Sequence, residues 1–297
     1  MSGANRITMQ MNGDCTCKHY MVFCVNFCSY DHLHTLMESV ERAAAKANGL
    51  CHITLCVGDN TASDWQGIPE NLTPHCTLKS FPYHLNIGYL GCALRMMAEV
   101  GWQEVSQASY CIISNVDLTL REDFFSVLAT TEWPADTGWL APDIFTERLN
   151  HHDNPFQTHR PRKRDFIRWQ LLYSNHIIYK WLEKLYHLRG KHQNIPDKQT
   201  TIYAGHGSLM VISGQFLAKH PYLKFPTFMY GEELFFAELI YQDKLKTYYC
   251  PSLYVSNVGR VSTGKYNYKW LCRQNRKSLR ILKGYCFRYP ILKNSEY

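Results

Sequence analysis

The chain has 297 residues, of which 45% are hydrophobic, a share that is ordinary for a globular protein with a packed core and unlike that of a disordered chain. This length allows one large α/β domain or two small ones, because domains usually run to about 100–200 residues. The formal net charge of +7 favours an anionic partner such as a nucleotide, a phospholipid surface or a nucleic acid, without choosing among them.

Twelve cysteines raise the question of a disulfide framework or a zinc site. Cys24, Cys56 and Cys111 lie within apolar runs, where Cys behaves as a small hydrophobic residue. The remaining cysteines lack the spacings that zinc sites use. No charged segment followed by an apolar core begins the chain, and no stretch reaches the roughly 18 apolar residues of a membrane span. We therefore expect a reducing, cytoplasmic location.

The first half of the chain alternates strands and helices. Residues 1–17 are polar and predict a loose tail. Residues 19–27 predict a strand, residues 29–50 a helix that Ser29 or Asp31 can cap, and residues 52–57 a second strand. A third strand is predicted from residue 77, a helix from near Gly91, and a fourth strand at 110–113. Such alternation predicts a mainly parallel sheet with helices on both faces.

The second half changes in composition. Residues 146–200 are basic, aromatic and helical in period, which predicts an insertion within an α/β domain that spans residues 18–265. Further strand and helix signals follow at 205–217, 225–242 and 246–255. Residues 266–297 predict a basic helical extension, because no Asp or Glu occurs between Lys244 and Ser295.

Polar residues follow the predicted strands. Asn26, Asp59, Asn86 and Asp117 each come at or after the end of one. In parallel sheets ligands bind beyond the carboxyl ends of the strands, so these side chains are expected at one edge.

Asp117 follows the buried strand at 110–113 and allows two interpretations. An Asp after a strand often caps the next helix, and the residues from Arg121 do resemble a helix start. Alternatively, Asp117 binds a divalent cation that holds a diphosphate. Mg²⁺ and Mn²⁺ need only one or two protein carboxylates, since water and phosphate fill the other positions.

Glu232 and Glu233 also allow two interpretations. They follow Gly231 and precede an apolar run, where acidic residues simply favour the dipole of a helix N-terminus. Alternatively, one of them is a general base whose pKa is raised by burial among aromatic residues.

Taken in order, the motifs resemble those of the family 2 inverting glycosyltransferases with a GT-A fold, especially bacterial O-antigen and rhamnosyltransferase-like members. The similar segments are V-N-F-C-S-Y at 25–30, V-G-D-N-T-A-S at 57–63, N-I-G-Y at 86–89, N-V-D at 115–117, G-S-L-M at 207–210, F-M-Y-G-E-E at 228–233 and S-T-G at 262–264. The likeness covers residues 20–145 and 203–280, and ordered matches of this number are more specific than any one alone.

The resemblance implies a role for each matching residue. It implies that Asp117, with Mg²⁺ or Mn²⁺, holds the donor diphosphate, and that Glu233 or Glu232 is the base, with position favouring Glu233. It implies acceptor-side contacts from Gly207 and Ser208. The residues that it implies bind the donor nucleotide are Asn26, Asp59, Asn60, Asn86, Gly88 and Asn115. A single in-line displacement by the acceptor hydroxyl inverts the configuration at the anomeric carbon of the sugar, so the reaction needs no nucleophile from the protein.

The resemblance also implies partners. These are a nucleotide-diphosphate sugar and a polyprenyl-diphosphate-linked or oligosaccharide acceptor, in bacterial surface polysaccharide assembly. The basic aromatic helices around Trp169, Trp181 and Trp270 predict peripheral binding to the anionic inner face of the cytoplasmic membrane, although charge runs often meet only water.

Two other functions remain open on the sequence. The basic segments suit a non-catalytic α/β protein that binds nucleic acid, although that interpretation leaves the placement of Asp117 and Glu233 unexplained, and we expect no nucleic-acid partner. Asn257 and Val258 stand where the family often carries a His that is a possible metal ligand. This departure keeps a sugar-nucleotide binder without transfer activity as a third interpretation.

Overall fold

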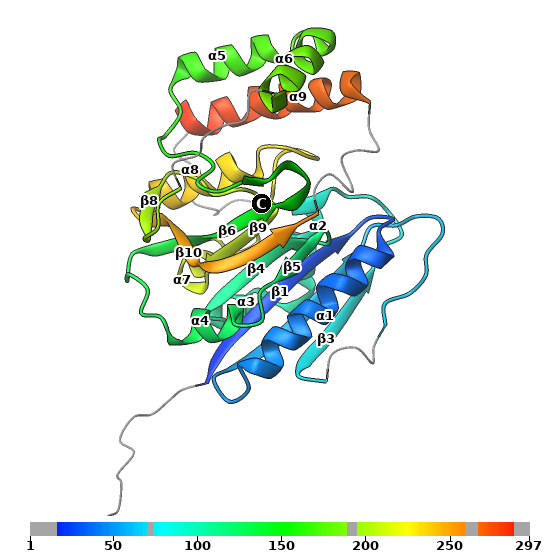
Figure 1. Cartoon of the computed structure of the whole chain (residues 1–297), viewed down its shortest axis with the longest axis vertical. Helices are drawn as coiled ribbons and strands as arrows, with labels where there is room; N and C mark the ends of the chain where they lie inside the picture. Colours follow the sequence, from blue (N-terminus) through cyan, green and yellow to red (C-terminus); the bar gives the residue numbers. More distant parts are fainter. Residues whose placement is uncertain (1–16, 70–73, 189–194, 259–266, 288–297) are drawn as a thin grey trace, which may run out of the picture.

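The structure is a computed structural model that describes residues 17–69, 74–188, 195–258 and 267–287 (Figure 1). Most of the predicted N-terminal tail, the S-T-G motif at 262–264 and the end of the predicted C-terminal extension lie outside the described residues.

The described residues form one α/β unit. Its strands are β1 (Lys18–Asn26), β2 (Cys51–Asp59), β3 (Cys76–Pro82), β4 (Tyr110–Asn115), β5 (Leu118–Leu120), β6 (Thr137–Thr146), β7 (His151–His152), β8 (Thr200–Ile202), β9 (Leu209–Ser213) and β10 (Lys246–Asn257). Its helices are α1 (Tyr30–Lys46), α2 (Tyr89–Val100), α3 (Trp102–Gln107), α4 (Phe124–Thr130), α5 (Lys163–Leu172), α6 (His176–Leu188), α7 (Gly214–Lys219), α8 (Glu232–Gln242) and α9 (Tyr268–Phe287).

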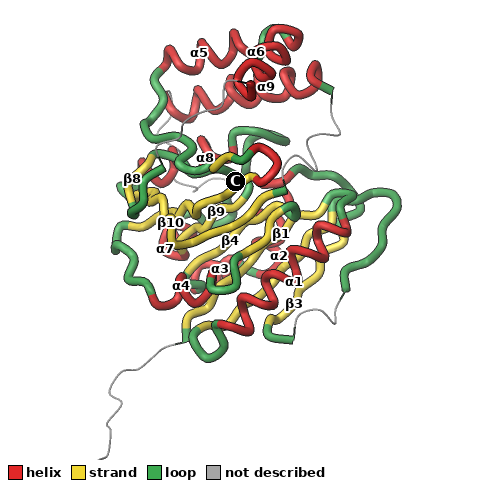
Figure 2. Tube along the Cα trace, viewed as in Figure 1, coloured by secondary structure: helices red, strands yellow, loops and turns green. Residues whose placement is uncertain are grey.

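The central sheet is mainly parallel, which confirms the predicted fold class. Figure 2 shows its strands lying side by side between helices. The strand order is β3-β2-β1-β4-β9-β6-β10-β5. Strands β3, β2, β1 and β4 pair in parallel, and so do β6 and β10, whereas β9 runs antiparallel between β4 and β6. The six parallel strands therefore end at the same edge of the sheet, and β9 begins there.

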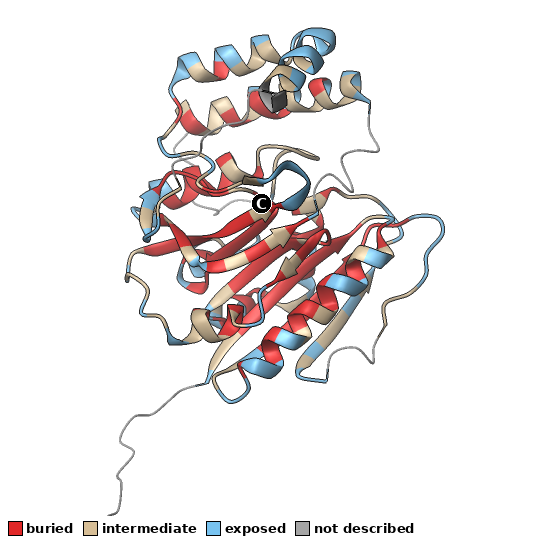
Figure 3. Cartoon of the chain, in the orientation of Figure 1, coloured by how far each residue is buried: buried red, intermediate tan, exposed pale blue. Residues whose placement is uncertain are grey.

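Helices cover both faces of this sheet. Alternate side chains of β1 enter two separate cores: Met21 and Phe23 pack with α2, α3, α7 and α8, and Tyr20 and Val22 pack with α1 and α4. This period-two alternation is what a strand buried on both faces requires. Figure 3 shows the buried residues concentrated in the sheet and on the inner sides of these helices.

Several local predictions can be compared with the structure. Cys24, Cys56 and Cys111 are buried, as predicted, and burial raises the pKa of each thiol. Ser29 does occupy the N-cap of α1, but it makes no side-chain cap bond, because its hydroxyl donates to the Phe27 carbonyl instead. Asp117 caps no helix, since β5 follows it and the next helix, α4, has Asp123 at its N-cap.

Helices α5, α6 and α9, here called the helical layer, stand beyond the edge of the sheet on the side of α8 (Figure 1). Residues 146–200 contain α5 and α6, and also β7 and the start of β8, which both pair with the main sheet. Within the described part of the chain, no helix combines the length and the apolar character needed to cross a membrane.

Candidate functional site

The carboxyl edge of the sheet gathers most of the polar residues that the sequence singled out. Strands β1, β2, β4, β6 and β10 end there on a polar side chain: Asn26, Asp59, Asn115, Thr146 and Asn257. Because β9 runs the other way, Gly207 and Ser208 lie before its first residue at the same edge. Parallel sheets bind ligands at this edge.

Asn26, Asp59 and Asn60 join the ends of β1 and β2. The Asn26 amide donates to Asp59 Oδ1 over 3.2 Å, and the Tyr30 hydroxyl donates to Asp59 Oδ2 over 2.7 Å. The backbone N–H of Thr61 also donates to Asp59 Oδ1. Asn26, Asp59 and Asn60 are almost fully buried, so these contacts fix the two strand ends. Their predicted contact with a nucleotide stays a prediction.

The loop before α2 meets the loop before α8. Asn86 Oδ1 accepts from the Gly88 N–H over 3.0 Å, and the Asn60 amide donates to the Gly88 carbonyl over 3.1 Å. Gly88 has φ +83° and approaches the Phe228 backbone so closely that a Cβ would lie 2.1 Å from the Phe228 carbonyl oxygen. Only glycine fits this position. Asn86 and Gly88 thus lie beside the segment that carries Glu232 and Glu233.

The segment at 207–208 links the predicted diphosphate side to the predicted base. The Asn115 N–H donates to the Ser208 carbonyl over 2.9 Å, and the Tyr89 hydroxyl donates to the same carbonyl over 3.4 Å. The neighbouring Gly207 N–H donates to Glu233 Oε1 over 3.3 Å. A continuous set of contacts therefore leads from Asn115, two residues before Asp117, to Glu233.

Tyr89 marks the place where the acidic residues converge. Burial raises the pKa of its hydroxyl well above the ordinary value, and the negative charges of Glu232, Glu233 and Asp117 add to this effect. Charges act strongly only at short range in a protein. Asp117 is itself only 7% exposed. Asp117 and the two glutamates, which are more than a hundred residues apart in sequence, thus lie at the same edge of the sheet, where their negative charges all act on Tyr89.

Glu232 and Glu233 differ in environment. Glu232 is 7% exposed, and its Oε1 accepts from the Tyr230 N–H over 3.1 Å. Burial, and then the charge of Glu233, raise the pKa of Glu232 to about 8. Glu233 is partly exposed at the same helix start. The raised pKa that the sequence suggested for a base near aromatic residues is thus found on Glu232.

Glu232 is expected to make stability depend on pH. The folded protein holds its proton up to about pH 8, whereas an ordinary Glu loses it near 4.5, so the folded state binds more protons between these values and becomes less stable as pH rises. Glu232→Gln removes this loss. A tenfold change in proton affinity is worth about 1.4 kcal/mol, or roughly 2–4 °C in Tm. The Tm advantage of the variant, measured by calorimetry, should grow by at least that much from pH 5 to pH 9. An equal difference at both pH values would contradict it.

Helix α9 holds the loop before α8. The Ser278 hydroxyl donates to the Tyr230 carbonyl, and Gly231, with φ +92°, is so close to α9 that a Cβ would lie 2.2 Å from Leu282 Cδ1. This contact was not predictable from the sequence, because Ser278 lies 48 residues from Tyr230 and outside every motif that the sequence offered.

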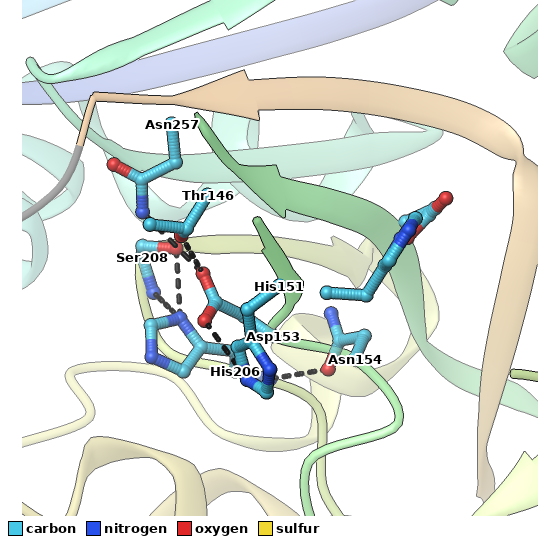
Figure 4. A network of polar contacts seen from close by, with 9 residues as sticks. Thr146, His151, Asp153, Asn154, His206, Ser208 and Asn257 are labelled. Carbon is cyan, nitrogen blue, oxygen red and sulfur yellow. Dashed lines mark hydrogen bonds and ion pairs between the residues drawn. The ribbon is translucent and has the colours of Figure 1, made fainter. Parts of the chain in front are cut away.

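A second polar cluster, the Asp153 network, extends the edge (Figure 4). Asp153 Oδ2 accepts from the Thr146 hydroxyl over 2.6 Å and from the Asn257 amide over 3.5 Å. His151 Nε2 lies 3.8 Å from Asp153 Oδ1. The Val258 N–H donates to the Asp117 carbonyl over 3.1 Å, which places the end of β10 between Asp153 and Asp117.

His206 connects the Asp153 network to the contacts around Glu233. Its N–H donates to Asn154 Oδ1, and its Nδ1 is hydrogen-bonded to the Ser208 hydroxyl, each over 2.8 Å (Figure 4). Asn154 is fully buried and also donates to the Pro142 carbonyl, so His206 is held in place. Sequence reasoning missed His206, although it directly precedes the G-S-L-M motif. Its position there was the one available signal.

Among the described residues, no group of three or more His, Cys, Asp or Glu side chains is arranged to hold a metal ion. A site made wholly of such protein ligands is therefore not found in that part of the chain. A cation that takes one carboxylate and completes its shell with phosphate oxygens and water needs no such group.

A separate groove of about 360 Å³ lies beside the starts of α5 and β10. It is lined by residues 158–160, 201–203 and 245–247 together with Ala237, Ile240 and Tyr241 of α8. Since β10 begins there, this groove faces the opposite edge of the sheet from Asp117.

Comparisons with known proteins give only distant likenesses, and these are to solved structures. No protein-family model and no curated protein matches the chain. Among solved structures it is similar to one described as the crystal structure of GalNAc-T7 with UDP, GalNAc and Mn²⁺, at 13% identity and a TM-score of 0.47, over 82% of this chain and 44% of that one. The chain thus spans less than half the length of that protein.

Proposed function

We propose that the protein is an inverting GT-A-type glycosyltransferase, which moves a sugar from a nucleotide-diphosphate donor to a hydroxyl of an acceptor. The observation that carries the proposal is the set of contacts at the carboxyl edge of the sheet that leads from Asn115, two residues before Asp117, through Ser208 and Gly207 to Glu233. Sugar transfer needs two things there: stabilisation of charge on the leaving diphosphate and removal of a proton from the acceptor. One acidic residue on each side of a small molecule meets both needs.

Glu233 is the proposed general base. It is partly exposed, so an acceptor hydroxyl can reach it, and the Gly207 N–H holds its Oε1. Glu232 is less suited, because it is buried, is bonded to its own loop and keeps its proton at neutral pH. A protonated carboxyl cannot accept the proton of the acceptor. Its proposed role is to shape the start of α8.

Asp117 is the proposed residue for the diphosphate side. A Mg²⁺ or Mn²⁺ ion bound there would neutralise charge on the leaving phosphates. The chain fits such an ion, since Asp117 supplies a hard carboxylate oxygen and remains slightly exposed at the edge. Asn115, which is partly exposed beside it, is proposed to contact the donor.

The nucleotide is proposed to lie against the loops of Asn60 and Asn86. Asn86 is partly exposed on the adjoining loop. Asn26 and Asp59 join the ends of β1 and β2 beside these loops, and the Asn60 amide donates to the Gly88 carbonyl.

The acceptor is proposed to approach from the side of Gly207, Ser208 and His206. The Gly207 N–H contacts Glu233 on one side, and the His206 N–H contacts Asn154, next to Asp153, on the other, so this segment offers polar groups beside the base. We propose a polyprenyl-diphosphate-linked or oligosaccharide acceptor, and a role in bacterial surface polysaccharide assembly. The motif likeness in the sequence supports this finer assignment.

A thermal-shift panel tests the proposed activity class. Nucleoside diphosphates are added with and without Mn²⁺, because a ligand that binds only the folded state raises Tm. At least one nucleoside diphosphate is expected to raise Tm by several degrees when Mn²⁺ is present, whereas the corresponding nucleoside is not. If no nucleotide shifts Tm and no nucleotide sugar is turned over, the proposal is wrong.

A further inference from the structure

The helical layer is fixed to the rest of the protein at two places. Arg160, just before α5, makes two bonds of 2.9 and 2.7 Å to the carboxylate of Glu238 on α8, and a bond of 2.7 Å to the Cys286 carbonyl at the end of α9. Glu238 is 1% exposed. The second place is the contact of Ser278 and Leu282 with the loop before α8. The layer is thus part of the folded body.

Helix α6 packs with its more polar face. The Tyr179 ring lies 6.1 Å from the Tyr268 ring of α9 in a tilted arrangement, and the Tyr268 hydroxyl donates to Glu183 over 2.7 Å. The opposite face is apolar and open to solvent, with Ile177 68% and Trp181 64% exposed. Ordinary amphipathic helices bury the apolar face. Here the polar face is packed and the apolar one lies outside.

Helix α5 continues the same arrangement. Phe166 is buried against Trp169 and Phe287. Ile167 and Leu171, one helical turn apart, are exposed. With α6 this gives an outer apolar face made of Ile167, Leu171, Ile177, Ile178, Trp181 and Leu182. Figure 3 shows exposed residues along the outer sides of α5 and α6. Large apolar side chains that are exposed in such number on two successive helices mark a contact with another molecule or a membrane.

The helical layer also holds most of the excess positive charge. Residues 162–185 and 267–287 contain twelve Lys or Arg and two Asp or Glu, whereas the whole chain has 32 and 25. The rest of the chain therefore has more acidic than basic residues. Arg164 and Arg168 are exposed beside Ile167 and Leu171, and Lys180 and Lys184 are exposed on α6.

Charge and side-chain type together select one partner. A second copy of the chain would bring an equally basic layer to the same face, and like charges would repel it. Nucleic acid binds cations, but it offers no apolar phase for isoleucine and leucine. An anionic bilayer satisfies both features, because acyl chains take the apolar residues and headgroups take the cations.

We propose that the outer apolar face docks on the anionic phospholipid surface of a membrane, with Trp181, Ile177 and Ile178 entering the headgroup region. The cytoplasmic leaflet carries the anionic lipids that fit this charge. Because α9 contacts the loop before α8, docking holds Glu233 at a fixed position relative to the bilayer. The docking itself requires no nucleotide and is independent of the proposed transferase activity.

Co-sedimentation with vesicles tests the docking surface. The full chain is mixed with vesicles of neutral phosphatidylcholine alone or with 30% phosphatidylserine, a composition chosen to carry about the charge of an anionic leaflet. We expect binding to the anionic vesicles at low salt, at least tenfold weaker binding to neutral ones, and a decline as salt rises.

Two variants and their controls locate the surface. Replacing Ile177, Ile178 and Trp181 with Ser should weaken binding to anionic vesicles at least tenfold, and so should Arg164→Glu with Arg168→Glu. The matched controls are Trp65→Ser with Tyr222→Ser, and Lys219→Glu with Lys224→Glu, which are exposed residues elsewhere and should bind normally. An unchanged Tm shows that each variant is folded.

Several outcomes would overturn the proposal. Wild-type protein that stays in the supernatant with anionic vesicles at low salt is one, and apolar variants that bind as well as wild type are another. Light scattering that shows a dimer broken by the Trp181 variant would assign the face to a second copy. Retention on nucleic acid, with none on vesicles, would assign it to that partner.

Discussion

Replacing Glu233 with Gln is expected to lower the turnover of a nucleotide sugar by about 10²–10⁴-fold, the usual contribution of a general base. The amide oxygen of the new side chain can still accept the bond from the Gly207 N–H, so the local structure should remain, but the amide cannot take a proton from the acceptor. Binding of the nucleoside diphosphate should not change, because the substitution acts on the acceptor side. Transfer assays give kcat, and thermal shift gives the affinity for the nucleotide.

Glu232→Gln is the matched control for this result. Glu232 already keeps its proton at pH 7, and an amide oxygen can accept the same bond from Tyr230, so kcat at that pH should fall by less than tenfold. If Glu232→Gln abolishes transfer and Glu233→Gln does not, the base is Glu232. Equal activity of all three proteins would place the base elsewhere.

Asp117→Asn is expected to remove the binding of a nucleoside diphosphate that depends on a divalent cation. Wild-type protein with Mn²⁺ and nucleotide at a hundred times Kd should gain about 2.7 kcal/mol of stability, which corresponds to several degrees in Tm. The variant loses the charged oxygen that a hard cation prefers, so its gain should approach zero. Treating wild-type protein with EDTA should have the same effect, and adding back Mn²⁺ should restore the shift.

Asp153→Asn is the control for Asp117→Asn. Asp153 is a carboxylate at the same edge, but Thr146 and Asn257 already donate to it. This variant should keep most of the Mn²⁺-dependent shift. If Asp153→Asn abolishes the shift and Asp117→Asn keeps it, the cation site belongs to the side of His151 and Asp153.

The strand ends were predictable because they follow local rules. An apolar run that ends on a polar residue predicts a buried strand. Because parallel strands end at one edge of a sheet, the sequence predicted that Asn26, Asp59 and Asp117 lie at the same edge. The structure agrees with this position. Hydrogen bonding of those side chains was not predictable, since it depends on neighbours from other strands. Asp59 is tied to Asn26 and Tyr30, which no spacing rule reveals.

Glu232 and Glu233 show more clearly what the sequence could not predict. The pair after Gly231 predicted a helix start and a candidate base, but adjacent residues on a helix point in different directions. Only the packing of the loop on α9 decides that Glu232 is buried and that Glu233 is partly exposed. The pKa of a carboxyl follows from that burial.

The sequence by itself determined the elements, the parallel sheet, the polar edge and the basic character of the helices around Trp181 and Trp270, because periodicity and composition are local properties of a chain. Tertiary structure alone decided which acidic residues share a space, that His206 and Asp153 join them, and which face of α6 is left open. Those outcomes depend on contacts between residues far apart in the chain. The neighbours of each side chain are known only when all the segments have packed together.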